Sequence, residues 1–177
     1  MSNIATYLGG NEHFADTEFA PELSIAPARK TLLVGCLDPR VDPAQIFEFT
    51  LGDVGIIRNV GGRITPGVIE EIAMLATLSR VLGGKLGPGW DLIILQHTDC
   101  GITRLTDSPD ELARYFGIDI AALADKHVED PAAAIVADIA TLREAASVPG
   151  AFTVTGLMYD VQTGHVETVV ESAPLRP

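Results

Sequence analysis

Residues 31–40, Thr-Leu-Leu-Val-Gly-Cys-Leu-Asp-Pro-Arg, form the stretch around which the chain is organised. Its apolar first half predicts a buried strand, and the chain becomes polar where that strand ends. Alternate residues of an extended chain point the same way, so Cys36, Asp38 and Arg40 are expected on one face. Pro39 supports this, because the residue before a proline is restricted to extended conformations. The strand is therefore expected to end in a thiol, a carboxylate and a guanidinium that lie together.

A second stretch with the same design lies about sixty residues further on. The apolar residues 92–95 lead into His97-Thr98-Asp99-Cys100. The spacing of His97 and Cys100 lets an imidazole and a thiolate reach one ion from a single turn. Together with Cys36 they make two cysteines and one histidine, a three-ligand zinc arrangement with an open fourth position. This set uses both cysteines of the chain.

Each half of this set has an ordinary structural explanation when it is taken alone. A cysteine at a strand end is most often a small buried residue, and Asp38 with Arg40 can be a plain surface ion pair. Two such groups at the ends of two strands favour a shared site. Three classes remain open: a zinc lyase or hydrolase, a structural or sensing zinc module, and a redox protein that uses Cys36 and Cys100 without zinc.

Composition narrows the choice of partners and compartment. A chain of 177 residues is expected to form one α/β body with a substantial core. The formal net charge is −12 and basic residues do not cluster, which argues against a nucleic-acid partner. No run approaches the roughly 18 apolar residues of a membrane span, and the start lacks a signal-peptide pattern, so we expect a cytoplasmic protein without membrane contact. In a reducing compartment two cysteines are more often ligands or free thiols than a disulfide.

The order of elements predicts the fold class. Strands alternate with helices, which indicates an α/β fold: a mostly parallel central sheet of about four strands, an antiparallel edge strand and helices on both faces. Sites in such sheets lie at the carboxyl ends of the strands, as both groups do here. The predicted strands are 31–36, 54–58, 91–96, 151–159 and, at the edge, 165–170. The predicted helices begin after Asp42, Thr65, Ser108 (in a capping box with Glu111) and Asp130, with an irregular helical stretch up to Glu129.

The first thirty residues are expected to form a separate helical arm. They mix short apolar groups with acidic residues and predict one or two short helices, ending near Pro21 and Pro27. Such an arm has too little apolar surface to fold alone, so we expect it to pack on the body or on another subunit. The predicted organisation is an arm over residues 1–30 and a single α/β zinc-enzyme domain over residues 31–177, in a homodimer or larger homo-oligomer.

Several motifs together carry a resemblance to a known family. They are Cys36-x-Asp38-x-Arg40, Arg58-Asn59-Val60-Gly61-Gly62, His97-Thr98-Asp99-Cys100-Gly101 and the closing Gly156-x-x-Tyr159-Asp160-Val161-x-x-Gly164. In this combination the chain resembles the β-class carbonic anhydrases, in particular their short bacterial branch. Pro39 departs from the pattern, since this position usually holds a small residue. The resemblance implies one Zn²⁺ per chain, held by Cys36, His97 and Cys100, in a dimer or larger assembly.

The resemblance also implies an activity. Zinc-bound hydroxide would hydrate carbon dioxide to bicarbonate, oriented by a dyad of Asp38 and Arg40. Asp38 has a second expected role, as a fourth metal ligand in a closed state. The same branch resembles hydrolases of carbonyl sulfide and carbon disulfide, so a COS or CS2 hydrolase is the alternative function on the same site.

Overall fold

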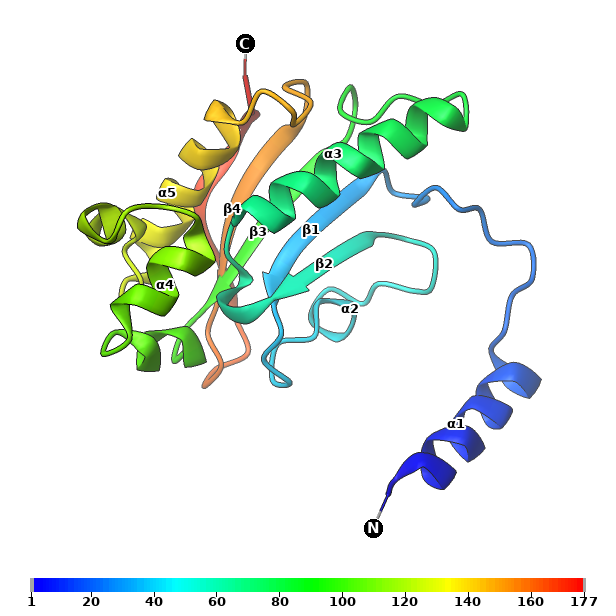
Figure 1. The fold of residues 1–177 in the computed structure, drawn as a ribbon. Coiled ribbons are helices and arrows are strands. Elements are labelled where there is room, and N and C mark those ends of the chain that lie inside the picture. Colours follow the sequence, from blue (N-terminus) through cyan, green and yellow to red (C-terminus); the bar gives the residue numbers. More distant parts are fainter. Residues whose placement is uncertain (1, 177) are drawn as a thin grey trace.

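A five-stranded sheet in the order β2-β1-β3-β4-β5 forms the centre of the computed structural model, which describes residues 2–176 (Figure 1). The first three pairings are parallel, and β5 runs antiparallel to β4. The predicted α/β fold with a mostly parallel sheet and an antiparallel edge strand is therefore confirmed. The strands are β1 (Thr31–Cys36), β2 (Gly55–Asn59), β3 (Asp91–His97), β4 (Thr153–Tyr159) and β5 (Val166–Pro174).

The edge strand is longer than the sequence predicted. β5 continues to Pro174 instead of ending at Val170. Its register with β4 shifts on either side of Gly156, and pairing resumes beyond the irregularity at Ala173 and Pro174. A bulge of this kind interrupts the alternation of side chains, which is why the sequence pattern appears to stop early.

The α-helices of the body each begin with a proline in the first turn, where the missing N–H group leaves no bond unmade. Three of them begin after Asp42, Thr65 and Asp130, as predicted, and these residues cap the helices through their side chains. The capping box predicted at Ser108 is wrong, because the backbone of Ser108 (φ −123°, ψ 61°) lies outside the extended region of a cap and its side chain makes no capping bond. These helices are α2 (Pro43–Ile46), α3 (Pro66–Val81), α4 (Pro109–Phe116) and α5 (Pro131–Glu144), with 3₁₀ segments η1 (Val60–Gly62), η2 (Gly101–Leu105) and η3 (Ile120–Lys126).

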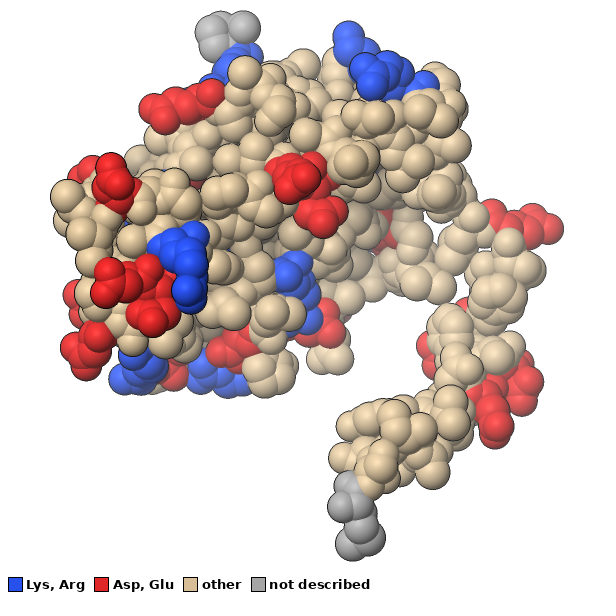
Figure 2. Space-filling model, in the orientation of Figure 1, with Lys and Arg blue, Asp and Glu red and all other residues tan. Residues whose placement is uncertain are grey.

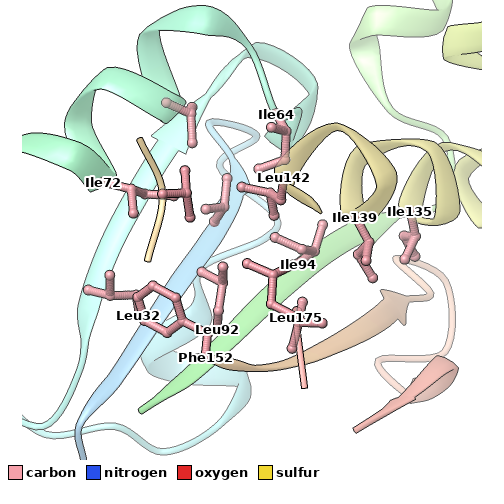
Figure 3. Close-up of a cluster of buried hydrophobic side chains, with 14 of the residues drawn as sticks. Leu32, Ile64, Ile72, Leu92, Ile94, Ile135, Ile139, Leu142, Phe152 and Leu175 are labelled. Carbon is pink, nitrogen blue, oxygen red and sulfur yellow. The ribbon is translucent and has the colours of Figure 1, made fainter. Parts of the chain in front are cut away.

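The largest core lies between the sheet and the pair α3 and α5 (Figure 3). Alternate residues of the central strands, such as Leu32 and Ile94, point into it and meet Ile72 of α3 and Ile139 of α5. Burial of side chains of this size contributes about 1.5–3 kcal/mol each. The opposite face has a thinner cover, made by α2 and the segment that follows it, around Leu33, Val41 and Leu95.

The N-terminal arm stands apart from this body (Figure 1). It contains one helix, α1 (Ile4–Thr17), which ends before the predicted boundary near Pro21 and has no buried residue. Large apolar side chains of the arm are exposed: Ile4, Tyr7, Leu8 and Phe19 are each 58–64% accessible. The body does not supply the packing that this surface needs, so its docking on another subunit stays a prediction.

The distribution of charged side chains and the lengths of the helices agree with what the sequence predicted. Figure 2 shows acidic side chains spread over the visible face, with Lys and Arg scattered among them instead of gathered in one patch. Within residues 2–176, no helix has both the length and the apolar character that crossing a membrane requires.

Candidate metal centre

The parallel register brings the two predicted ligand groups to the same edge of the sheet. Val34 of β1 pairs with Ile94 of β3, so Cys36 and His97 leave the sheet as neighbours. The turn after β3 then carries Cys100 back towards Cys36. In consequence, the candidate ligand atoms of Cys36, His97 and Cys100 all lie within 4.8 Å of one another, and all three side chains are buried.

His97 presents one free nitrogen to this cluster. Its Nδ1 lies 2.9 Å from the Thr98 carbonyl oxygen, which can only accept a hydrogen bond. The proton therefore sits on Nδ1, and Nε2 carries a lone pair. The side chain is fully buried, and Nε2 has no hydrogen-bond partner within residues 2–176. A buried imidazole nitrogen without a partner is unfavourable unless something binds it.

The two thiols are in direct contact. Their sulfur atoms lie 3.8 Å apart, and the backbone N–H of Asp38 points at Cys36 Sγ from 3.4 Å. The hydrogen bond from Cys100 lowers the pKa of Cys36 to about 4, while burial opposes it. The same contact, with burial, raises the pKa of Cys100. The pair therefore readily gives up its first proton and holds the second.

These residues fit a zinc ion. Two thiolates and a neutral imidazole are a donor set that zinc prefers, and Zn–S bonds of about 2.3 Å at tetrahedral angles place two sulfurs about 3.8 Å apart. The observed Sγ–Sγ distance of 3.8 Å matches that spacing. The unpartnered lone pair of His97 supplies the third donor. A second-sphere contact from Nδ1 to a backbone carbonyl, seen here, is the usual way to orient a metal-binding histidine.

Asp38 and Arg40 form a bidentate ion pair next to this centre. Arg40 Nε donates to Asp38 Oδ1 at 3.0 Å, and Nη2 donates to Oδ2 at 2.8 Å. The backbone N–H of Arg40 also donates to Asp38 Oδ1, at 2.9 Å. These bonds lower the pKa of Asp38 to about 2, chiefly through the side chain of Arg40. Asp38 is therefore an acceptor-only carboxylate at neutral pH.

Arg58 holds the turn that carries this pair, a role that the sequence analysis did not identify. Its Nε donates to the Cys36 carbonyl at 2.8 Å, and Nη2 donates to the carbonyls of Asp38 and Val41, both at 2.9 Å. One guanidinium thus fixes three backbone groups around the Cys-x-Asp-x-Arg segment. Arg58 follows the apolar residues of β2 at a strand end, and this position is the signal that could have identified it.

The glycine loop after β2 packs directly against β1. Gly62 has φ +61°, and a side chain there would lie 2.7 Å from the Cys36 backbone nitrogen. Only glycine therefore lets the loop approach the first cysteine so closely. The Asn59 side chain closes the loop by bonding both the N–H and the carbonyl of Arg63, each at 2.8 Å.

A buried ion pair beneath the loop was also missed. Arg63 is 1% exposed and Asp138 is fully buried, with Arg63 Nε 2.8 Å from Asp138 Oδ2. Burial raises the pKa of Asp138, and Arg63 opposes that shift. Asp138 lies on the apolar side of α5, next to Ile139 and three positions after Ile135. A lone carboxylate on an apolar helix face is the sequence signal for such a pair.

A hollow of about 520 Å³ adjoins the metal centre. Ile102, Leu112 and Tyr115 line it, and the same three side chains pack with Cys36 and Cys100 in one apolar cluster. Burial raises the pKa of Tyr115 to about 12, so its hydroxyl stays neutral and donates to the Val60 carbonyl at 2.8 Å. The remaining histidines, His13, His127 and His165, are exposed.

Comparison with known proteins gives a consistent family match. A family model described as carbonic anhydrase matches residues 31–119, about half of the chain. β-Carbonic anhydrase 1 of Mycobacterium tuberculosis is 32% identical over 107 residues, which cover 60% of each protein. The match thus spans less than two thirds of that relative's length. A carbon disulfide hydrolase of Acidithiobacillus thiooxidans is 26% identical over 166 residues, covering 82% of this chain and 79% of that protein.

Solved structures show the same architecture over nearly the whole chain. A carbonic anhydrase of Streptococcus mutans superposes with a TM-score of 0.74 at 29% identity, covering 96% of this chain and 98% of the other. Tetrameric β-carbonic anhydrases of Sordaria macrospora give a TM-score of 0.59 at 20% identity, a level that supports the fold alone.

Proposed function

This chain belongs to the carbonic anhydrase family, and on that premise we propose that it is a zinc enzyme that hydrates carbon dioxide to bicarbonate. The observation that carries the proposal is the buried group of Cys36, His97 and Cys100, with ligand atoms within 4.8 Å, next to the ion pair of Asp38 and Arg40. A structural zinc module needs the three ligands but gives Asp38 and Arg40 no task. A redox pair needs the thiols but not an imidazole with a free nitrogen.

Cys36, His97 and Cys100 would hold the zinc. Zinc with three protein ligands lowers the pKa of a water that it binds and so supplies a nucleophile near neutral pH. The chain's own contribution is to bring three donors together in a dry site. Burial of all three side chains excludes bulk water, and the contact of His97 Nδ1 with the Thr98 carbonyl keeps the ring in one tautomer.

Asp38 would orient the attacking group. Its carboxylate stays ionised at all physiological pH values, because Arg40 lowers its pKa to about 2. It can therefore accept a hydrogen bond but cannot donate one. Arg40 occupies both carboxylate oxygens from one side, which limits the directions from which Asp38 can accept a further bond. This restraint fixes the geometry of attack on a small electrophilic carbon.

Asp38 can also act as a fourth ligand that closes the site. Two thiolates and a carboxylate outweigh the charge of a divalent ion, and the pairing with Arg40 opposes this closure. Hydroxide is a stronger ligand than water, so opening is favoured at higher pH, and the rate should rise towards alkaline pH. Arg40→Ala should lower activity while zinc stays bound. Wild-type activity of Arg40→Ala at every pH would show that the ion pair has no such role.

The adjoining hollow supports a small uncharged substrate. Ile102, Leu112 and Tyr115 offer it an apolar wall beside the metal centre. Carbon dioxide is linear, neutral and apolar, and so are carbonyl sulfide and carbon disulfide. The carbon disulfide hydrolase relative, which covers more of the chain than the mycobacterial one, is the observation that favours a COS or CS2 hydrolase as the second candidate.

Metal analysis and two assays test the proposal. The purified protein should hold about one zinc per chain and hydrate CO2 in a stopped-flow assay. Cys36→Ala and Cys100→Ala should lose both zinc and activity, whereas His165→Ala, at an exposed histidine, should keep both. Full activity of a metal-free sample would end the proposal. Hydrolysis of COS or CS2 with negligible CO2 hydration would select the second candidate.

The arm over residues 1–30 would serve assembly, and residues 31–177 would form the catalytic body. The support is that no residue of α1 is buried, and that the apolar side chains of Ile4, Tyr7 and Leu8 are exposed. Burial of such side chains against a partner is favourable by about 25 cal/mol per Å². A homodimer or larger homo-oligomer is expected, and light scattering that gives the mass of a single chain would rule it out.

A further inference from the structure

We infer that Asp99 is a positioning residue that holds the guanidinium of Arg40 against Asp38, an inference that rests on the function proposed above. Asp99 lies between His97 and Cys100 in sequence, but its side chain is 48% exposed, unlike the buried side chains of the candidate metal centre. Its carboxylate Oδ2 accepts from Arg40 Nη1 at 3.0 Å. Its backbone carbonyl accepts from Arg40 Nη2, also at 3.0 Å.

Arg40 is therefore gripped on two neighbouring edges. Asp38 takes the edge formed by Nε and Nη2, and Asp99 takes the edge formed by Nη1 and Nη2. A planar guanidinium held on one edge by a carboxylate, and on the next by a carboxylate oxygen and a backbone carbonyl, cannot rotate about its long axis without breaking bonds on both. If only Asp38 held the guanidinium, the guanidinium and the Asp38 carboxylate could move together. The second grip thus fixes where Asp38 points.

Asp99 is itself held in place. Arg104 Nη2 donates to Asp99 Oδ1 at 2.9 Å, so each carboxylate oxygen has its own cation. The backbone of Asp99 is left-handed, with φ +50°, a conformation in which Asp and Asn are among the favoured non-glycine residues. This conformation aims the Asp99 carbonyl at Arg40. The sequence alternation Asp38, Arg40, Asp99, Arg104 thus becomes a chain of ion pairs in space that joins the loop after β1 to the loop after β3.

The structure offers matched substitutions. Asp99→Asn and Asp99→Gly both tolerate the left-handed backbone, and both remove the charge that Arg40 faces. Asp107→Asn makes the same charge change at an exposed residue of the same segment that is in no ion pair within residues 2–176. An effect of net charge alone would appear in all three variants.

The first readout is the mobility of Arg40 and does not depend on catalysis. The Arg40 Nε–H signal, assigned by its loss in Arg40→Lys, is followed by ¹⁵N NMR on each protein as purified. Because exposed ion pairs are weak, solvent exchange of this proton should speed up only by roughly 3- to 5-fold in both Asp99 variants. It should not change in Asp107→Asn. Unchanged exchange in the Asp99 variants overturns the inference.

The second readout asks what the lost restraint does to Asp38. In the cobalt-substituted protein, visible bands report whether a carboxylate has joined the metal. Asp99→Gly should move these bands towards those of Arg40→Ala. In the Asp38→Ala background, Asp99→Gly should have no effect, because the carboxylate that it releases is gone. Bands that do not move, or that move equally without Asp38, overturn the positioning role. If Arg40 exchanges faster in the Asp99 variants but the wild-type protein neither binds zinc nor hydrates CO2, the proposed function fails. The restraint of Arg40 by Asp99 still stands in that case.

Discussion

Removing the carboxylate of Asp138 should be among the most damaging single changes in this protein. In Asp138→Leu, the Arg63 guanidinium stays buried but loses its partner, to which Nε and Nη2 now donate at 2.8 and 3.2 Å. What remains is the Lys126 carbonyl, 2.6 Å from Nη2, and the Phe116 ring, whose centroid is 4.9 Å from the guanidinium carbon. Both contacts exist before and after the change, so neither offsets the loss.

The expected loss in free energy of unfolding is that of a buried guanidinium left without its carboxylate partner. Breaking a buried ion pair by removing one partner costs about 3–5 kcal/mol. The total stability of a domain is about 5–15 kcal/mol, so this one change would consume a large part of it. The damage should also reach the metal centre, because Arg63 closes the glycine loop whose Gly62 packs on the Cys36 backbone. Zinc should dissociate at lower urea concentrations than in the wild type.

Urea unfolding followed by circular dichroism tests this reasoning. The comparison is between Asp138→Leu and the double variant Arg63→Met/Asp138→Leu, which have the same side chain at position 138. Relative to the single variant, the double variant no longer buries a charge and leaves one further group without its partner, the Lys126 carbonyl, at about 1–3 kcal/mol. It should therefore be more stable than the single variant by about 2 kcal/mol. If both unfold at the same urea concentration, the uncompensated charge is not the cause of the loss.

Three further changes have definite expected outcomes. Gly156→Ala should lower stability by about 1–3 kcal/mol in thermal unfolding, because its methyl group would overlap the Ile135 side chain, and an unchanged melting temperature would contradict this overlap. Hydrogen bonds from the Thr50 backbone N–H and hydroxyl hold the pKa of Asp53 below its ordinary value of 3.8. That contribution is complete above pH 3.8 and is lost as the pH falls through the lowered pKa, so Asp53→Asn should show a shallower loss of stability in acid. Deletion of residues 1–20 should convert the proposed oligomer to a species with fewer subunits in analytical ultracentrifugation, without loss of the secondary structure of the body. An unchanged number of subunits would show that α1 is not at the interface.

The sequence predicted those features that depend on short-range rules. The apolar pattern of β1 predicted that Cys36 ends a buried strand, and the rule that sites lie at carboxyl ends of parallel strands predicted His97 at the same edge. Asp38 and Arg40 do lie beside Cys36, but alternation is not the reason, because β1 ends at Cys36 and a turn from Asp38 to Val41 brings the two side chains together. Proline in the first turn marked the helix starts. These rules need only neighbouring residues, so the sequence alone indicates the candidate metal ligands.

The sequence did not predict the contacts that depend on how the loops fold over the sheet. Arg63 and Asp138 are 75 residues apart and meet only because the fold brings α5 next to the residue that follows the glycine loop. The grip of Asp99 on Arg40 joins two loops whose relative position is set by the register of β1 and β3. Serine is a favoured capping residue, but the backbone of Ser108, which follows the 3₁₀ segment η2, lies outside the extended conformation of a cap. Each of these needs the tertiary arrangement first.

The strand order would make binding of the proposed zinc ion part of folding. β1 and β3 are neighbours in the sheet, but β2 and α3 separate them along the chain. In an unfolded chain, His97 and Cys100 can offer two donors, and the third donor arrives only when the crossover has docked. A metal ion that binds only the native state adds about 2.7 kcal/mol to stability when its free concentration is about a hundred times its dissociation constant. By the same linkage, any substitution that loosens the contact between the two central strands will also weaken zinc binding. The proposed zinc ion should therefore leave faster from any variant in which β1 and β3 pair less firmly.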